Sequence, residues 1–268
     1  MSKILLVVLF FIPFLSLGVE CGISTTQLFP ENHNIDVDQL FMLQNGMETE
    51  KSLFSINNFD YSLRSEQGEI IELLIFDSTR INLNAQILLK PDCPLKLGTK
   101  YFFYSQFKYN DEKYADLPDE WFEKQRWKGK FFIVDSAKDY NVPKDLHLDY
   151  KEIVGAKELK QSSSIGFTLL VSLEPNYFLL TNEVWYEVTI RNSKGELFRT
   201  YLKPFQGNFE IGYWECGGNM RFDPSLSYEI KTSAMAMNGL KNTASEWRSI
   251  TNPWKEVDSL VRKTIIGR

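Results

Sequence analysis

Apolar and polar residues alternate along two stretches in the second half of this chain. In residues 184–191, Val184, Tyr186, Val188 and Ile190 take every second position. Residues 167–173 repeat the pattern. Successive side chains of a β-strand point to opposite faces of a sheet, so a period of two predicts strands with one buried face.

Short runs rich in β-branched and aromatic residues recur along the rest of the chain, and polar turn residues separate them. We predict strands at residues 23–29, 39–43, 53–57, 61–64, 70–76, 83–89, 101–107 and 127–134, and then at 146–153, 167–173, 184–190 and 197–202. Residues 65–68, SEQG, and 192–195, NSKG, are predicted hairpin turns. Regularly spaced short strands of this kind predict an all-β sandwich.

Residues 87–107 form a corner between two of these strands. Pro91 and Pro94 cannot donate a hydrogen bond inside a sheet, so they end the strand at 83–89. Gly98 supplies turn chemistry before the strand that opens on Tyr101. Residues 222–237 repeat this order of features.

Both corners resemble a motif of immunoglobulin-like and fibronectin type III domains. In such sandwiches a Tyr at the start of strand F bonds its hydroxyl to upstream backbone, and Tyr101 and Tyr228 stand at matching places. Residues 97–101, LGTKY, resemble the corner of bacterial Ig-like and fibronectin type III domains, and residues 224–228 are similar to it. The opening of a bacterial Ig-like domain is similar to residues 29–37. The resemblance implies two tandem β-sandwich domains, and it concerns fold rather than function.

The chain length of 268 residues suits two domains of ordinary size. Residues 136–143, SAKDYNVP, are polar and end in proline, which predicts a boundary there. We expect a signal peptide at 1–18, an Ig-like sandwich at 19–138, a fibronectin type III-like or Ig-like sandwich at 139–252, and a C-terminal tail at 253–268. The tail could form a short helix, and it either docks on the domain or frays.

Residues 1–18 have the order of a secretory signal peptide. Lys3 is followed by an apolar run at 4–15 and by the small residues Ser16 and Gly18. An uncleaved anchor is the alternative, although the apolar run is short for a membrane span. We expect an extracytoplasmic protein in the periplasm, on the cell surface or secreted, and no membrane span once it is mature.

An extracytoplasmic location would allow disulfide bonds to form. Cys21, Cys93 and Cys216 predict one disulfide and one remaining thiol, and their spacing does not choose the pairing. Glu20 directly before Cys21 fits a lipidation motif poorly. The three cysteines and two histidines have no zinc spacing, so we expect neither metal nor cofactor.

Aromatic residues in loops are the candidate binding residues. Trp121 and Phe122 lie in an irregular charged connection at 109–126, where they either contact a partner or pack onto their own sandwich. Trp185 alternates away from its strand's apolar face, so it either faces solvent or is covered by another element. Tyr213 and Trp214 precede Gly217-Gly218, which we interpret as a hairpin or bulge.

No arrangement of residues predicts catalysis. The sequence has neither G-x-S-x-G nor H-E-x-x-H, and His33 and His147 fall in separate predicted domains. A carbohydrate-active enzyme using the acidic residues of the 109–126 connection, or a carbohydrate-binding accessory protein, is the alternative, but a glycosidase needs two carboxyls across a cleft.

The expected function is a non-enzymatic binding, adhesion or structural module of the cell envelope. Its expected partner is an envelope or extracellular protein, or a glycan. The net charge of −5 argues against nucleic acid, because phosphate binding needs a basic face.

Overall fold

The structure is a computed structural model of the whole chain, and it describes residues 26–45, 56, 59–81, 84–107, 129–138, 141–161, 164–176, 184–203, 209–214 and 217–257. Of residues 26, 107, 156–161, 164–167, 214 and 217 it describes the backbone alone. These residues form β-strands and short 3₁₀ turns, with no α-helix among them, which confirms the all-β prediction.

Several predictions lie outside the described residues. They concern the signal peptide at 1–18, Cys21, the connection at 109–126 with Trp121 and Phe122, Cys216, and the tail after residue 257. Of the strand predicted at 53–57 only Ile56 is described, in a 3₁₀ turn.

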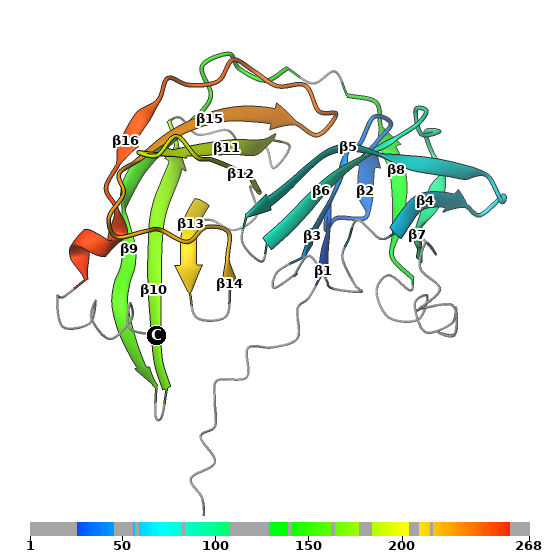
Figure 1. Cartoon of the computed structure of the whole chain (residues 1–268). Helices are drawn as coiled ribbons and strands as arrows, with labels where there is room; N and C mark the ends of the chain where they lie inside the picture. Colours follow the sequence, from blue (N-terminus) through cyan, green and yellow to red (C-terminus); the bar gives the residue numbers. More distant parts are fainter. Residues whose placement is uncertain are drawn as a thin grey trace, which may run out of the picture.

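The N-terminal half of the chain, up to residue 138, forms an eight-stranded sheet (Figure 1). Its strand order is β1-β3-β6-β5-β4-β7-β8-β2. The strands are β1 (Thr26–Phe29), β2 (Asn34–Asp36), β3 (Phe41–Asn45), β4 (Phe59–Ser65), β5 (Ile70–Ile81), β6 (Asn84–Pro91), β7 (Lys100–Phe107) and β8 (Phe131–Ser136). All neighbours pair antiparallel except β2 and β8, which pair parallel.

Strand β5 folds this sheet into two layers. Residues 70–73 pair with β4 and residues 73–81 pair with β6, with a bulge between Ile75 and Asp77. Side chains of β1, β3 and β6 therefore face those of β4, β7 and β8 across one apolar core. The order β1-β3-β6-β5 beside β4-β7-β8 matches strands A-B-E-D and C-F-G of an immunoglobulin-type sandwich.

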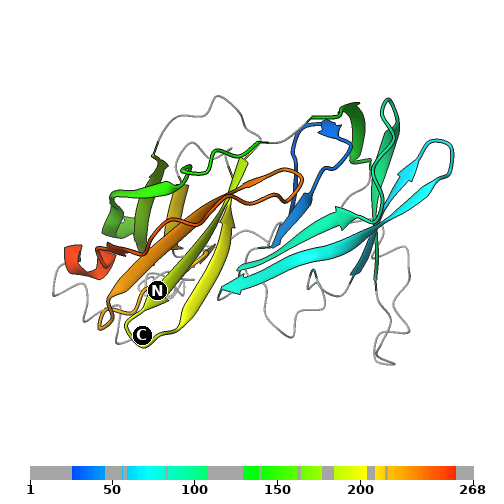
Figure 2. The same cartoon turned by 90° about the horizontal axis from the view of Figure 1, so that it is seen from above.

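The C-terminal half has two four-stranded sheets, β14-β13-β10-β9 and β12-β11-β15-β16. Their strands are β9 (Leu148–Gln161), β10 (Ser164–Pro175), β11 (Val184–Asn192), β12 (Leu197–Leu202), β13 (Phe209–Trp214), β14 (Gly217–Gly218), β15 (Tyr228–Ala236) and β16 (Arg248–Ile250). The sheets pack face to face over a second apolar core, seen from above in Figure 2. The predicted domain boundary falls between β8 and β9, and the division into two domains stays a prediction.

Both corner tyrosines make the predicted bond. The hydroxyl of Tyr101 accepts a hydrogen bond from the backbone N–H of Lys96 at 3.3 Å, and that of Tyr228 accepts one from the N–H of Asp223 at 2.6 Å. Each donor lies five residues before its tyrosine. Burial of the ring raises the pKa of Tyr228, so its hydroxyl stays protonated at neutral pH.

Apart from the strand predicted at 53–57, the strand predictions match observed strands in position and are often wrong in extent. Strand β5 runs to Ile81 rather than residue 76, and β9 runs to Gln161 rather than residue 153. No strand was predicted at Asn34, which opens β2, and its partner strand β8 is distant in sequence. The hairpin prediction for Gly217-Gly218 is confirmed, because β14 pairs antiparallel with β13.

The described start of the tail packs on the C-terminal half as a 3₁₀ turn, η4 (Pro253–Glu256). Its Trp254 is buried, and the indole N–H donates to the carbonyl of Phe222 at 2.7 Å. The first residues of the tail therefore dock on the C-terminal half rather than fray.

Replacing Tyr228 with Phe removes the acceptor of the Asp223 N–H and leaves that donor without its partner. We expect Tyr228→Phe to lower the free energy of unfolding by about 1 to 3 kcal/mol, measured by urea denaturation. Tyr104→Phe, at an exposed ring, is the control and should change it by less than about 0.5 kcal/mol. Equal losses in the two variants would contradict the corner assignment.

Candidate functional site

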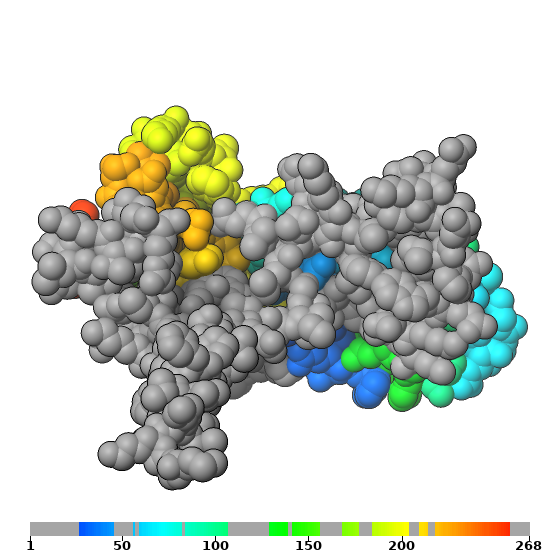
Figure 3. Space-filling view, turned by 60° about the horizontal axis from the view of Figure 1, so that its bottom comes forward, coloured from blue at the N-terminus to red at the C-terminus, as the bar shows by residue number. Residues whose placement is uncertain are grey.

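A third apolar cluster joins the two halves of the chain. Its members are buried side chains from both halves: Phe29, Leu40, Met42 and Leu88 from the first, and Trp185, Tyr201, Met235 and Met237 from the second. The backbone N–H of Leu40 also donates to the carbonyl of Met237 at 2.6 Å. These contacts fix the position of one half relative to the other. In Figure 3 the yellow-to-orange atoms of the second half gather at the upper left, and the blue-to-cyan atoms of the first half lie mainly to the right of them.

Strands that are apolar on both faces make this interface possible. In β6, Ile87 and Leu89 point into the core of the N-terminal half, whereas Leu88 between them points at the other half. In β11, Val184 and Tyr186 point into their own core and Trp185 points the opposite way. Alternation thus sends one side chain of each strand into a core and the next into the interface.

The amide of Gln86 pairs across the interface with the backbone of β12. Its Oε1 accepts from the N–H of Tyr201 at 2.8 Å, and its Nε2 donates to the carbonyl of Tyr201 at 2.8 Å. The hydroxyl of Thr200 donates to the same Oε1 at 3.0 Å. Strand β12 is an edge strand, so the Gln86 side chain takes the place of a neighbouring strand for one residue.

Asp77 adds a charged contact beside this amide. Its two carboxylate oxygens accept from the hydroxyl of Tyr201 and from the guanidinium of Arg199, the latter at 2.6 Å. Burial, the bond to Asp77 and the nearby charge of Glu187 raise the pKa of Tyr201, which keeps the phenol protonated as a donor.

Lys203 is a buried cation at the end of this interface, with 6% of its surface exposed. Its ammonium donates to Oε1 of Gln27 at 3.1 Å and lies 3.3 Å from the centre of the Phe29 ring. Burial lowers the pKa of Lys203 to about 7, against a smaller opposing effect of Glu31.

The predicted binding residues do not gather into one site. Trp185 is 3% exposed and packs in the interface, so the proposal that it contacts a partner is corrected, because the other half of the chain covers it. Tyr213 is half-buried, with the guanidinium of Arg221 at 4.6 Å from its ring. The side chain of Trp214 is outside the described part, as are Trp121 and Phe122.

Cys93 is exposed and carries a free thiol. A disulfide through Cys93 is therefore absent, and the other two cysteines lie outside the described residues. Burial and the hydrogen bond with Asp92 raise the pKa of the Cys93 thiol, which makes the reactive thiolate scarcer.

The two histidines contact backbone carbonyls. His33 Nδ1 lies 2.8 Å from the carbonyl of Phe131, and its ring stacks on the Phe131 ring at 4.2 Å between centroids. His147 Nδ1 lies 2.7 Å from the carbonyl of Asp145. Within the described residues no group of three or more His, Cys, Asp or Glu side chains is placed to hold a metal ion, and no helix there is long and apolar enough to cross a membrane.

Exposed apolar side chains follow the junction of the two halves. Leu74 and Phe76 of β5 are 54% and 43% exposed, and Leu240 after β15 is 58% exposed. Leu74 pairs with Lys90 across the strands, and the Lys90 ammonium lies 6.0 Å from the Phe76 ring centre. The Phe76 ring also borders Gly239, which precedes Leu240. We call these four residues, Leu74, Phe76, Lys90 and Leu240, the junction strip.

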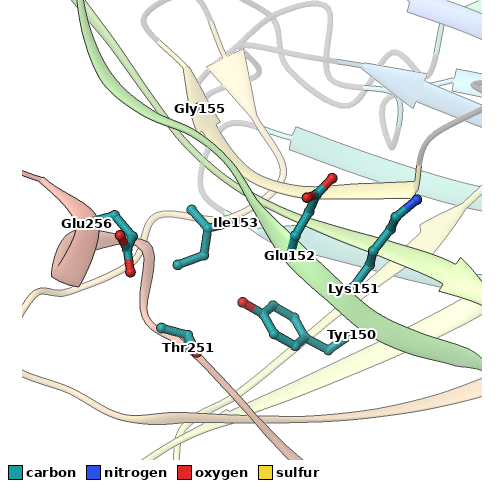
Figure 4. A pocket seen from close by; sticks show the side chains of 7 residues that line it. All are labelled: Tyr150, Lys151, Glu152, Ile153, Gly155, Thr251 and Glu256. Atoms are coloured by element: carbon teal, nitrogen blue, oxygen red, sulfur yellow. The ribbon is translucent and has the colours of Figure 1, made fainter.

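A hollow of about 560 Å³ opens beside β9, which pairs only with β10 in the described part of the chain (Figure 4). Its lining comes from β9 and from the segment around β16 and η4: Tyr150, Lys151, Glu152, Ile153, Gly155, Thr251 and Glu256. The hollow combines a strand edge with apolar and charged side chains.

Trp185→Ala removes the largest aromatic side chain from the buried cluster between the halves. We expect it to lower the free energy of unfolding by about 3 to 5 kcal/mol, because a buried Trp is lost and a cavity stays. Leu197→Ala, at an exposed position, is the control and should cost less than about 0.5 kcal/mol. If the two variants unfold at the same urea concentration, Trp185 does not hold the halves together.

The variant Lys203→Met tests whether the buried Lys203 side chain titrates, through the pH dependence of the free energy of unfolding. The folded pKa near 7 lies below the ordinary lysine value, so between these values the unfolded chain binds a proton that the folded chain does not. The wild type should therefore be less stable than Lys203→Met by about 2 to 4 kcal/mol below pH 7. The difference should shrink as the pH rises from 7 towards 10. A difference that does not change with pH would contradict a buried, titrating Lys203.

No family model matches the chain, and no curated protein matches it. Among solved structures it is similar to a pullulanase of Anoxybacillus sp. LM18-11 complexed with maltotriose (10% identity, TM-score 0.22, covering 86% of this chain and 25% of that one). It is also similar to a cytokine receptor complex (10% identity, TM-score 0.24, covering 89% of this chain and 99% of that one). A third similar structure is that of the chicken CNTN1 FN1–FN3 domains (11% identity, TM-score 0.27, covering 85% of this chain and 65% of that one). The chain thus spans about a quarter of the pullulanase. TM-scores this low establish no shared fold, and the all-β class rests on the strand pairing of this chain.

Proposed function

We propose that this chain is an exported, non-enzymatic protein-binding module of the cell envelope. The observation that carries the proposal is the junction strip. Three large apolar side chains there remain exposed although the chain buries apolar residues of the same kind in three clusters. Exposed apolar groups that lie together, with charged residues at their margin, are typical of surfaces that bind another protein.

The composition of the strip supports a protein partner. Phe76 offers an aromatic ring, and aromatic anchors dominate the energy of many protein interfaces. Lys90 has no ion pair within the described residues, so its ammonium is available to an acidic group of the partner. Apolar contact would supply affinity and the lysine would set orientation.

The interface between the halves makes the strip a fixed surface. Leu74, Phe76 and Lys90 belong to one half and Leu240 to the other, and the buried cluster with the Gln86 amide holds them in place. A preformed surface loses less conformational entropy on binding than a flexible one.

Export and the absence of enzyme activity are further parts of the proposal. The order of charged, apolar and small residues at 1–18 supports export. The carbonyl contacts of His33 and His147 occupy one nitrogen of each ring and favour structural roles for both.

The test is capture of partners by crosslinking in cells, followed by mass spectrometry. Leu74→Thr combined with Leu240→Ser should reduce recovery of the dominant protein partner by about tenfold, because the apolar contacts of both halves are lost. Both residues are exposed, so the free energy of unfolding should change by less than about 0.5 kcal/mol.

Leu197→Ser is the matched control, since it removes an equally exposed leucine, 64% exposed, from the β11–β12 hairpin. It should leave capture unchanged. Undiminished recovery by the double variant would refute binding through the strip, and recovery of glycan without a protein partner would replace the proposal with carbohydrate binding.

A further inference from the structure

Lys203 directly follows β12 in the second half of the chain, and its amine contacts the first half. It donates to Oε1 of Gln27 at 3.1 Å and lies 3.3 Å from the centre of the Phe29 ring, and both partners belong to β1. Phe29 is also part of the buried cluster between the halves. The amine is therefore covered where the two halves dock.

The contacts of this amine suit its neutral form. An ammonium has three N–H donors, whereas a neutral amine has two. Within the residues that the structure describes, the nitrogen has two partners, the Gln27 oxygen and the face of the Phe29 ring. A neutral amine can donate one N–H to each of them, because an aromatic face accepts an N–H weakly. An ammonium would keep a third donor unpaired in a buried position.

No carboxylate of the described residues forms an ion pair with Lys203. Glu31, beyond the end of β1, acts on it only through its charge and is itself exposed. The ammonium of Lys130 contacts the Glu31 carbonyl and places a second positive charge beside it. On β3, the residue opposite Gln27 is the uncharged Gln44.

Burial outweighs the attraction of the ring for a cation. A cation–π contact recovers only part of the cost of taking an ammonium out of water. Burial therefore lowers the pKa of Lys203 from 10.5 to about 7, against the smaller opposing effect of Glu31.

We propose that the two halves dock with Lys203 as a neutral amine, so that docking releases a proton and tightens as the surroundings become more alkaline. The junction strip is complete only in the docked form, because Leu240 belongs to the second half and its other members to the first. Proton release would thus regulate the surface to which a binding role is assigned above.

The direction of the effect follows from counting protons. When the halves separate, the amine reaches water and its pKa returns towards 10.5. Between about pH 7 and that value, the separated form binds a proton that the docked form lacks, so docking tightens by about tenfold for each pH unit. Below about pH 6 both forms are protonated, and docking no longer depends on pH.

The measurement is amide hydrogen exchange of the full chain, because two backbone N–H groups donate from one half to the other. The N–H of Leu40 donates to the carbonyl of Met237, and the N–H of Tyr201 donates to Gln86 Oε1. Protection is expressed relative to an unstructured peptide at the same pH, which removes the intrinsic effect of pH on exchange. Protection of both amides should be constant from pH 5 to 6 and rise about tenfold from pH 6 to 8.

Amides of the β4–β7 ladder report unfolding of the N-terminal core. They should be at least about tenfold more protected than the two amides between the halves, because separation of the halves needs less disruption than unfolding. Equal protection of both sets would mean that the halves separate only when the chain unfolds, and it would overturn the proposal.

Three variants identify the titrating group. Lys203→Met carries no proton, so protection of the two amides should not change with pH and should exceed the wild-type value at pH 6. Lys203→Arg stays charged throughout, so its protection should be equally constant but no higher than that of the wild type at pH 6. Lys194→Met, at an exposed lysine of the β11–β12 hairpin, is the matched control and should keep the tenfold rise. A rise that persists in Lys203→Met, or constant protection in the wild type, would overturn the proposal.

This test and the capture experiment fail separately. Hydrogen exchange is measured without any partner, so constant protection would refute proton-dependent docking and leave the role of the junction strip as it stands. Undiminished capture by the strip variant would refute binding through the strip, and the expected rise in protection would still support proton-dependent docking.

Discussion

The hydrogen bonds between the Gln86 side chain and the backbone of Tyr201 are the contact on which the arrangement of the two halves depends. They lie among apolar side chains, where an unpaired amide or peptide group would cost about 1 to 3 kcal/mol. Because the amide satisfies both the N–H and the C=O of Tyr201, a displacement of β12 past Gln86 would break both bonds. Apolar contact alone would fix the halves less specifically, since it has no preferred direction.

The parts of the fold that were predictable from sequence depend on local chemistry. Tyr101 and Tyr228 each bond to a backbone group five residues away, so short segments carried the whole signal. Strand positions followed from alternation for the same reason. Pairing between distant strands could not be predicted from local patterns. Nothing near Asn34 in the sequence indicates that this residue pairs with β8. The extension of β5 to Ile81 depends on the change of its partner strand from β4 to β6.

The candidate sites were largely beyond sequence reasoning. Alternation placed Trp185 opposite the core of its own strand, but the residues that cover it come from the other half of the chain. Leu74, Ile75 and Phe76 lie in the strand predicted at 70–76, and they form an apolar run without alternation, which does not show which side chains are exposed. Their exposure arises because β5 has left β4 by then. The hollow beside β9 follows from the separation of two strand edges, which no pattern of residues records.

The parallel pairing of β2 with β8 determines how the N-terminal half bears mechanical load. These strands stand near the beginning and the end of that half, so tension along the chain pulls β2 and β8 towards opposite ends of their shared ladder. Their hydrogen bonds are then loaded together in shear rather than opened one after another, although the register shifts between Ile35 and Asp36. The resistance of the N-terminal half to extension would thus reside in a strand of three residues, Asn34–Asp36, held to β8.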